Sequence, residues 1–203
     1  MKILFLTNNC EVSKPLWDWL SANGEDVHCY KDPIDSAFVI REKIDFIISY
    51  NYIHLIKRNV LDILPHRVIN LHISLLPYNR GASPNIWSFI NGTLNGITIH
   101  EIDEGLDTGD ILLQQQITFD PNIETLRSSY SKLHLMIQGL FRENWDSLKL
   151  LKISPKKQYG EGTTHKKDDM QCYAEILDYD DKICEFLKKV KTVNYTHERN
   201  KPN

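Results

Sequence analysis

The 203-residue sequence lacks long apolar runs, a cysteine motif and an excess of basic residues. The apolar run at residues 3–6 is too short for a signal peptide, and a membrane-spanning helix needs about 20 apolar residues. The cysteines show no CxxC spacing, so we interpret them as structural thiols in a reducing cytoplasm. A net charge of -3 gives no sign of a broad basic surface for nucleic acid. We therefore expect a cytoplasmic protein that binds neither membranes nor nucleic acid.

Three chemical signatures are missing as well. The turn at residues 7–9, after the first predicted strand, lacks the GxGxxG glycines, so a nicotinamide or flavin dinucleotide is not expected there. Ser74 has no GxSxG elbow around it, which argues against a covalent acyl-enzyme. No cluster of histidine, cysteine and carboxylate residues has the spacing of metal ligands, so we expect no metal.

The sequence does contain a regular alternation of strand-like and helix-like segments. Apolar runs predict strands at residues 2–6, 27–30, 45–50 and 68–72. The segments between them predict helices at residues 12–20, 36–42 and 55–64. This order predicts an α/β fold, with a Rossmann-like, mostly parallel sheet and flanking helices. Functional groups in such sheets gather at the carboxyl ends of the strands.

The second half of the chain predicts a hairpin, a long helix and a short appendage. Residues 97–102 and 111–119 predict two strands joined by a polar loop, and apolar residues spaced by four and three predict a long helix after residue 125. The composition changes near residue 154. We therefore assign residues 1–153 to the main domain and residues 154–203 to a small C-terminal extension. One amphipathic helix from Ile176 to Val190 is expected there, followed by a frayed end from residue 197.

Three polar residues form a candidate catalytic group. Asn70 and His72 are two apart in a predicted strand, so they point to the same side, and Asp107 lies in the loop of the hairpin. An imidazole can take a proton from an attacking amine, and an amide N–H can donate to a developing oxyanion. A carboxylate nearby would orient the imidazole and favour its protonated form. The group predicts acyl transfer by direct attack of an amine. From the residues alone, a structural histidine and an ordinary polar turn remain the alternative.

Three linked motifs carry a family resemblance. NLHISLLP at residues 70–77, RGASP at 80–84 and GLDTGD at 105–110 resemble the signature of the 10-formyltetrahydrofolate-dependent formyltransferases. The resemblance implies the formyltransferase fold, 10-formyltetrahydrofolate as the formyl donor and no metal. Asn70 would then hold the formyl oxygen, His72 would assist proton transfer, and Asp107 would pair with His72. The residues expected to wrap the folate are Ser74, Leu75, Leu76, Pro77, Asp103, Gly105 and Asp110.

The acceptor amine is not set by the fold or the donor. SPNIWSF at residues 83–89, GITIHEIDEG at 96–105 and GTTHKK at 162–167 are most similar to the sugar N-formyltransferases. That similarity implies a dTDP-linked amino-dideoxy sugar, formylated on its C4 or C3 amino group. Glycinamide ribonucleotide and methionyl-tRNA are the alternative acceptors. The first would need a glycine-rich turn after the first strand, and the second a basic surface.

Aromatic and basic residues outside the catalytic group could contact the sugar nucleotide. Rings can stack on a base or a sugar, and cations can meet a pyrophosphate. The expected contacts are Tyr78, Arg80, Trp87, His100, His165 and Lys166. The alternatives are that Lys166 is only a solvated lysine and that Trp87 belongs to the core. Longer sugar formyltransferases dimerise through a C-terminal β-hairpin, which residues 192–195 could begin, so a homodimer is also expected.

Overall fold

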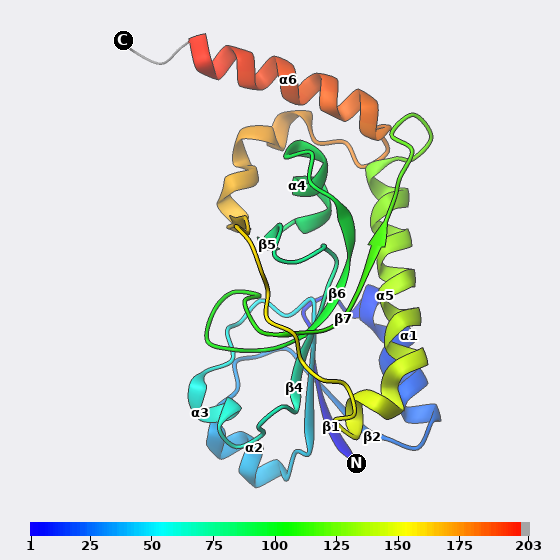
Figure 1. Ribbon diagram of the computed structural model, residues 1–203, viewed down its shortest axis with the longest axis vertical. Coiled ribbons are helices and arrows are strands. Elements are labelled where there is room, and N and C mark those ends of the chain that lie inside the picture. Colours follow the sequence, from blue (N-terminus) through cyan, green and yellow to red (C-terminus); the bar gives the residue numbers. More distant parts are fainter. Residues whose placement is uncertain (200–203) are drawn as a thin grey trace.

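The computed structural model describes residues 1–199, with side chains as far as Asn194, and within them six strands form one sheet. The strands are β1 (Lys2–Leu6), β2 (Asp26–Tyr30), β3 (Phe46–Tyr50), β4 (Val68–His72), β6 (Asn95–Glu101) and β7 (Ile111–Ile117). Their order is β2-β1-β3-β4-β6-β7, in which the first four are parallel and β6 is antiparallel to both of its neighbours. The predicted α/β fold with a mostly parallel sheet is confirmed (Figure 1).

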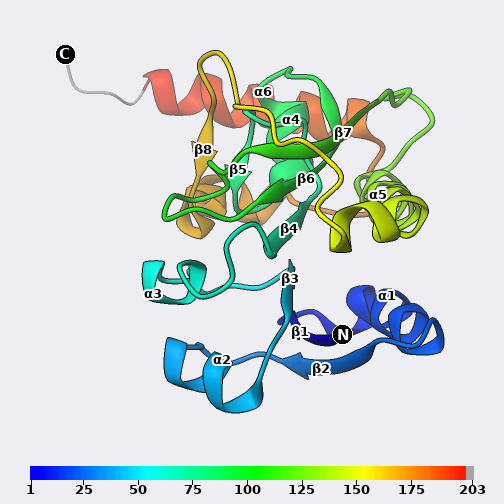
Figure 2. The ribbon, with the colours of Figure 1, turned by 60° about the horizontal axis from the view of Figure 1, so that its bottom comes forward.

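Helices cover both faces of the sheet. They are α1 (Cys10–Ala22), α2 (Ser36–Glu42), α3 (Arg58–Leu61), α4 (Pro84–Ile90), α5 (Leu126–Lys149), the 3-10 helix η1 (Lys167–Ile176) and α6 (Ile183–Arg199). α1 and α5 pack on one face, and α2 and α3 pack on the other (Figure 2). Because adjacent residues of a strand point to opposite faces, Phe5 belongs to the first of these cores while Leu4 and Leu6 belong to the second.

The long helix α5 forms where the apolar periodicity predicts it. Thr125 caps its start, since the Thr125 hydroxyl accepts a hydrogen bond from the backbone of Ser128 at 3.0 Å. Leu133, Ile137 and Phe141 recur along one side of the helix and are fully buried against the sheet. Burial of this stripe against the strands holds α5 along the sheet.

The helix predicted at residues 55–64 is wrong in its extent. The helix α3 covers four residues, Arg58–Leu61, and Lys57 before it is extended (φ -78°, ψ 156°). The apolar residues that suggested a longer helix do not share one buried face, because Leu55 is 67% exposed and its neighbour Ile56 is 4% exposed. The residues between β3 and α3 therefore form a loop at the carboxyl end of the sheet.

The C-terminal extension is not the single helix that the sequence predicts. Ile176 ends η1 and Ile183 begins α6, so the expected continuous helix is wrong. Residues 192–195 belong to α6, so the β-hairpin expected to begin there is also wrong. Of the segment expected to be frayed, residues 197–199 lie in α6 and residues 200–203 lie outside the described part of the chain.

The extension packs on the main domain through a shared core and through strand pairing, among other contacts. α4, η1 and α6 share a small core that includes Trp87, Tyr173 and Phe186. The two-residue strand β8 (Thr164–His165) pairs in parallel with β5 (Arg80–Gly81). The domain boundary near residue 154 stays a prediction, but the residues after it pack against the main domain. Each helix of the described residues is too short or too polar to cross a membrane.

Candidate active site

The three predicted catalytic residues lie together at the carboxyl end of β4. Asn70 and His72 are at the end of that strand, and Asp107 lies in the loop between β6 and β7. The antiparallel register places His100 of β6 directly opposite Asn70. The structure therefore adds His100, expected from the sequence to contact substrate, to the predicted group as a fourth polar side chain.

The carboxylate of Asp107 lies at the centre of this group. Its Oδ2 accepts a hydrogen bond from the backbone N–H of Gly81 at 2.8 Å and lies 3.5 Å from Nδ1 of His72. Its Oδ1 accepts from Nδ2 of Asn70 at 3.0 Å and lies 3.4 Å from Nε2 of His100. Burial opposes the charged form, but the two imidazoles and the Gly81 N–H outweigh it, so the pKa of Asp107 lies well below its ordinary value. Asp107 is therefore a fixed negative charge.

His72 is held so that one ring nitrogen faces the carboxylate. The ring is 7% exposed, and its Nε2 lies 3.0 Å from the backbone carbonyl of Asn79. Because a carbonyl oxygen can only accept, Nε2 carries the hydrogen and Nδ1 faces Asp107. Burial lowers the pKa of His72, and the Asp107 carboxylate offsets part of this effect. The imidazole is therefore neutral near pH 7, and Nδ1 is the atom that can accept a proton.

Asn70 has both of its amide hydrogens engaged. Nδ2 donates to Asp107 at 3.0 Å and contacts Nε2 of His100 at 3.2 Å. Nδ1 of His100 donates to the carbonyl of Glu101 at 2.7 Å. For Asn70 to donate to a substrate oxygen, one of these hydrogens must leave its partner. The longer contact, to His100, is the one more easily exchanged.

A cleft opens beside these residues, between the loop after β3 and the loop after β6. Asn70, His100 and Asp107 lie at its inner end. The remaining lining residues are Ser49, Tyr52, His54, Leu55, Ile56, Ile102, Asp103, Gly105 and Leu106. The wall made by Tyr52, His54, Leu55 and Ile56 was not predicted from the sequence. A signal for it was available, because these residues closely follow the carboxyl end of a predicted central strand.

Only two of the seven residues predicted to wrap a folate lie in the lining of the cleft. Asp103 and Gly105 line the cleft. Ser74, Leu75, Leu76 and Pro77 form a turn beneath the site, where the Ser74 hydroxyl donates to the carbonyl of Tyr78 at 2.8 Å. That turn leads to Asn79, whose carbonyl orients His72. Asp110 pairs with Lys157 at 3.1 Å. Contacts of all seven residues with folate stay predictions.

Apart from His100 on β6, the residues predicted to contact a sugar nucleotide lie in or near α4, β5 and β8. Trp87 is 8% exposed, and one face of its ring is stacked on His165, with centroids 4.0 Å apart and planes 5° apart. Arg80 donates to Gln158 through Nε and Nη2. Tyr78 is half-buried and Lys166 is exposed. Because β5 contains Gly81, which donates to Asp107, this group borders the catalytic residues. Its substrate contacts stay predictions.

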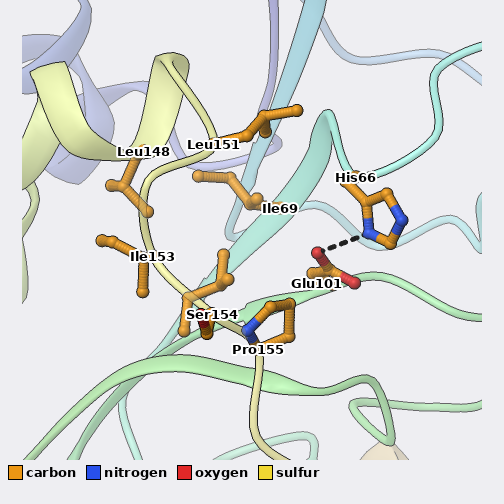
Figure 3. A pocket seen from close by; sticks show the side chains of 9 residues that line it. His66, Ile69, Glu101, Leu148, Leu151, Ile153, Ser154 and Pro155 are labelled. Carbon is orange, nitrogen blue, oxygen red and sulfur yellow. Dashed lines mark hydrogen bonds and ion pairs between the residues drawn. The ribbon is translucent and has the colours of Figure 1, made fainter.

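A second cavity lies on the opposite face of the sheet, beside the end of α5 (Figure 3). Apolar side chains line most of it, and the exposed His66 pairs at its edge with Glu101 at 3.0 Å. Ile69 points into this cavity while the next residue, Asn70, faces the first cleft. Of the predicted catalytic residues, Asn70 and Asp107 therefore line the first cleft, and none of the three lines this cavity. Across the described residues, no group of three or more metal-binding side chains could hold a metal ion.

A family model described as formyl transferase matches residues 32–141, more than half of the chain, including β4 and the loop with Asp107. The chain belongs to the formyl transferase family. This assignment agrees with the resemblance that the motifs at residues 70–77, 80–84 and 105–110 carry.

Three relatives show how far this similarity extends. The crystal structure of the formyltransferase PseJ from Anoxybacillus kamchatkensis, in complex with UDP-4,6-dideoxy-4-formamido-L-AltNAc and tetrahydrofolate, is 40% identical with a TM-score of 0.84, over 92% of this chain and 97% of that chain. A 4-N formyltransferase from Francisella tularensis is 26% identical with a TM-score of 0.71, over 89% and 81%. Methionyl-tRNA formyltransferase of Thermodesulfovibrio yellowstonii is 44% identical over 131 residues, 62% of this chain and 42% of that protein. The chain thus spans less than half the length of this tRNA enzyme.

Proposed function

We propose that this formyltransferase moves the formyl group of 10-formyltetrahydrofolate to the amino group of a sugar carried on a nucleoside diphosphate. The observation that carries the proposal is the similarity to PseJ, which reaches 40% identity and extends over 97% of that chain. The similarity to the tRNA enzyme covers 42% of that protein, so it supports the reaction more than the acceptor. The net charge of -3 also disfavours a large RNA acceptor.

The similarity to PseJ also favours one nucleotide carrier and one acceptor carbon of the sugar. The sugar bound to PseJ is linked to UDP and carries its formamido group on C4. At 40% identity this supports uridine diphosphate in preference to the dTDP expected from the sequence, and C4 in preference to C3. The similarity to a 4-N formyltransferase supports the same carbon.

The first cleft suits the donor in shape and chemistry. A folate has a flat heterocycle, which fits between loop walls with apolar side chains, such as those of Leu55, Ile56 and Ile102. At the inner end of the cleft, Asn70 and Asp107 are placed to meet the formyl group. The folate supplies a formyl carbon that an amine can attack.

The side chains then divide the chemistry between them. Nδ1 of His72 accepts the proton that the acceptor amine loses as its nitrogen bonds to the formyl carbon. An amide hydrogen of Asn70 stabilises the negative charge that develops on the formyl oxygen. The Asp107 carboxylate stabilises the imidazolium of His72. His72 returns the proton to the folate nitrogen as the bond between that nitrogen and the formyl carbon breaks.

Turnover with a panel of acceptors tests this function. The purified chain would be supplied with 10-formyltetrahydrofolate and, separately, UDP-4-amino-4,6-dideoxy-L-AltNAc, dTDP-linked 4-amino and 3-amino sugars, glycinamide ribonucleotide and methionyl-tRNA. Mass spectrometry would detect the gain of one CO. We expect formylation of the UDP-linked 4-amino sugar to be fastest. Formylation of glycinamide ribonucleotide or methionyl-tRNA alone would refute the sugar acceptor.

A further inference from the structure

The chain segment that follows α5 crosses the loop of Asp107 before it reaches β8. Figure 1 shows this segment in yellow as it passes the green loop between β6 and β7. Two backbone anchors fix the crossing. Lys156 forms a bridge with Ile111 of β7 through hydrogen bonds of 2.7 and 2.8 Å. Beyond it, β8 pairs with β5, the strand that contains Gly81.

Gln158 lies between these anchors, and its side-chain amide forms hydrogen bonds in two directions. Nε2 donates to the backbone carbonyls of Asp107 and Gly109, each at 2.8 Å. Oε1 accepts from Nε and Nη2 of Arg80, at 3.2 and 2.7 Å. The amide thus uses both of its hydrogens and both lone pairs of its oxygen. Gln158 therefore joins the loop of Asp107 to β5.

Asp107 is a residue that needs such support. Its φ of 54° is in the left-handed region, which is disfavoured for a residue with a side chain and which surrounding contacts must maintain. Its carboxylate accepts from Gly81, and Gly81 follows Arg80 in β5. Gly81 therefore binds the carboxylate of Asp107 directly. The adjacent residue Arg80 is connected to the backbone carbonyl of Asp107 through Gln158.

We propose that Gln158 is a positioning residue that fixes the loop of Asp107 so that the carboxylate stays against His72. Two nitrogen atoms of Arg80 orient the Gln158 amide in this arrangement, which gives Arg80 a role that needs no substrate contact. The extension after residue 153 then contributes directly to the geometry of the catalytic group. A kinetic test of this proposal rests on the proposed formyl transfer, whereas a structural test that follows the titration of His72 does not.

The kinetic test uses Gln158→Leu, which keeps most of the side-chain volume and removes the amide. We expect kcat to fall about 10- to 100-fold, because a small displacement of a catalytic group has effects of this size, while KM for either substrate changes about twofold or less. Gln116→Leu is the matched control, since it makes the same change at an exposed position of β7. In an Asp107→Asn background, Gln158→Leu should have little further effect. If Gln158→Leu lowers kcat by the same factor in the Asp107→Asn background as in the wild type, the proposal is overturned.

The structural test needs no substrate and follows the titration of His72 by NMR. The ring of His72 faces Asp107 and His100, and the carboxylate raises the pKa of His72 against the effect of burial. Displacing the carboxylate should therefore move the titration of His72 to lower pH in Gln158→Leu, in the same direction as in Asp107→Asn. The titration should not move in Gln116→Leu. This readout stands even if no acceptor in the panel is formylated.

A folded Gln158→Leu variant in which His72 titrates as in the wild type would overturn the proposal. Folding would be checked by urea unfolding of each variant. If Gln158→Leu does not fold, Gln158→Met takes its place. Methionine has a side chain of similar length and no charge, but it lacks the N–H groups that donate to the carbonyls of Asp107 and Gly109. The same shift in the His72 titration is expected for that variant.

Discussion

The carboxylate of Asp107 lies 3.5 Å from Nδ1 of His72, although one residue ends β4 and the other lies in a loop beyond β6. The other ring nitrogen of His72 faces a backbone carbonyl, so the nitrogen that can accept a proton is the one beside the carboxylate. The proposed base and the charge that would stabilise its protonated form thus lie side by side, and Asp107 lines the cleft.

The first prediction concerns the pH dependence of this pair. His72 acts as a base while neutral, and burial lowers its pKa from 6.5, so kcat/KM should fall with acid only below about pH 6.5. Asp107→Asn removes the charge that raises this pKa, so the acidic limb should move to lower pH. It should also reduce kcat by about 10²–10⁴-fold. Steady-state rates from pH 4 to 9 test both effects. An acidic limb that moves upward in Asp107→Asn would contradict the assignment.

The second prediction concerns Asn70 as the donor to the formyl oxygen. Asn70→Ala should lower kcat by about 10²–10³-fold and change KM for either substrate only slightly, because the interaction develops in the transition state. Asn144→Ala is a suitable control, since it removes an amide that bonds within α5, to the carbonyl of Leu140. Equal kcat values for Asn70→Ala and wild type would exclude the proposed role.

The third prediction concerns the wall of the cleft that the sequence analysis missed. Leu55 lines the cleft and is 67% exposed, so its side chain is available to pack on the folate. Leu55→Ala should raise KM for 10-formyltetrahydrofolate roughly five- to tenfold, because each CH₂ buried is worth about 0.8 kcal/mol. kcat at saturation should change little. Ile53→Ala is the control, since Ile53 is 75% exposed and lies outside the cleft lining. Equal effects of the two substitutions would argue against a folate contact at Leu55.

The fourth prediction separates the packing of Trp87 from a role in binding substrate. Trp87 is buried between His165 and Tyr173, so Trp87→Ala should lower the free energy of unfolding by about 3–5 kcal/mol. Trp87→Phe should have a smaller effect. Urea unfolding measures both values. An unchanged free energy of unfolding with a raised KM for the sugar nucleotide would show that the ring contacts substrate instead.

The fifth prediction concerns acid stability and a buried histidine away from the active site. Burial lowers the pKa of His134 from 6.5 to about 4. Between these two values the unfolded chain binds a proton at this residue that the folded chain does not, so stability falls as the pH drops from 6.5 towards 4. The contribution is roughly 3 kcal/mol across this window. His134→Gln should flatten the dependence of the unfolding free energy on pH, and an unchanged slope would contradict the prediction.

Much of the fold could be predicted because β1, β3 and β4 are short, mostly apolar runs. Both ends of β4, Val68 and His72, are predicted correctly from the sequence. The motifs at residues 70–77 and 105–110 locate the three catalytic candidates. The rule that functional groups gather at the carboxyl ends of parallel strands accounts for Asn70 and His72. It does not account for Asp107, because β6 is antiparallel to β4, and the pairing of Asp107 with His72 was expected from the family resemblance.

The remainder depends on contacts between distant parts of the chain, which local pattern does not encode. Leu55 and Ile56 look like one helical segment, yet one is exposed beside the cleft and the other is buried. Trp87 could stack on a ligand by its chemistry, but His165 already occupies one of its faces. Gln158 carries no recognisable motif, and its importance appears only when the carbonyl of Asp107 is found within its reach.

The pairing of β5 with β8 also has a consequence for the newly made protein. The chain is synthesised from its N-terminus, so Asn70, His72 and Asp107 leave the ribosome before Gln158 and His165. A nascent chain that has reached only the end of α5 contains every candidate catalytic side chain but lacks the strand and the amide that contact β5 and the loop of Asp107. Synthesis of the extension therefore adds these contacts after the residues that they hold in place have been made.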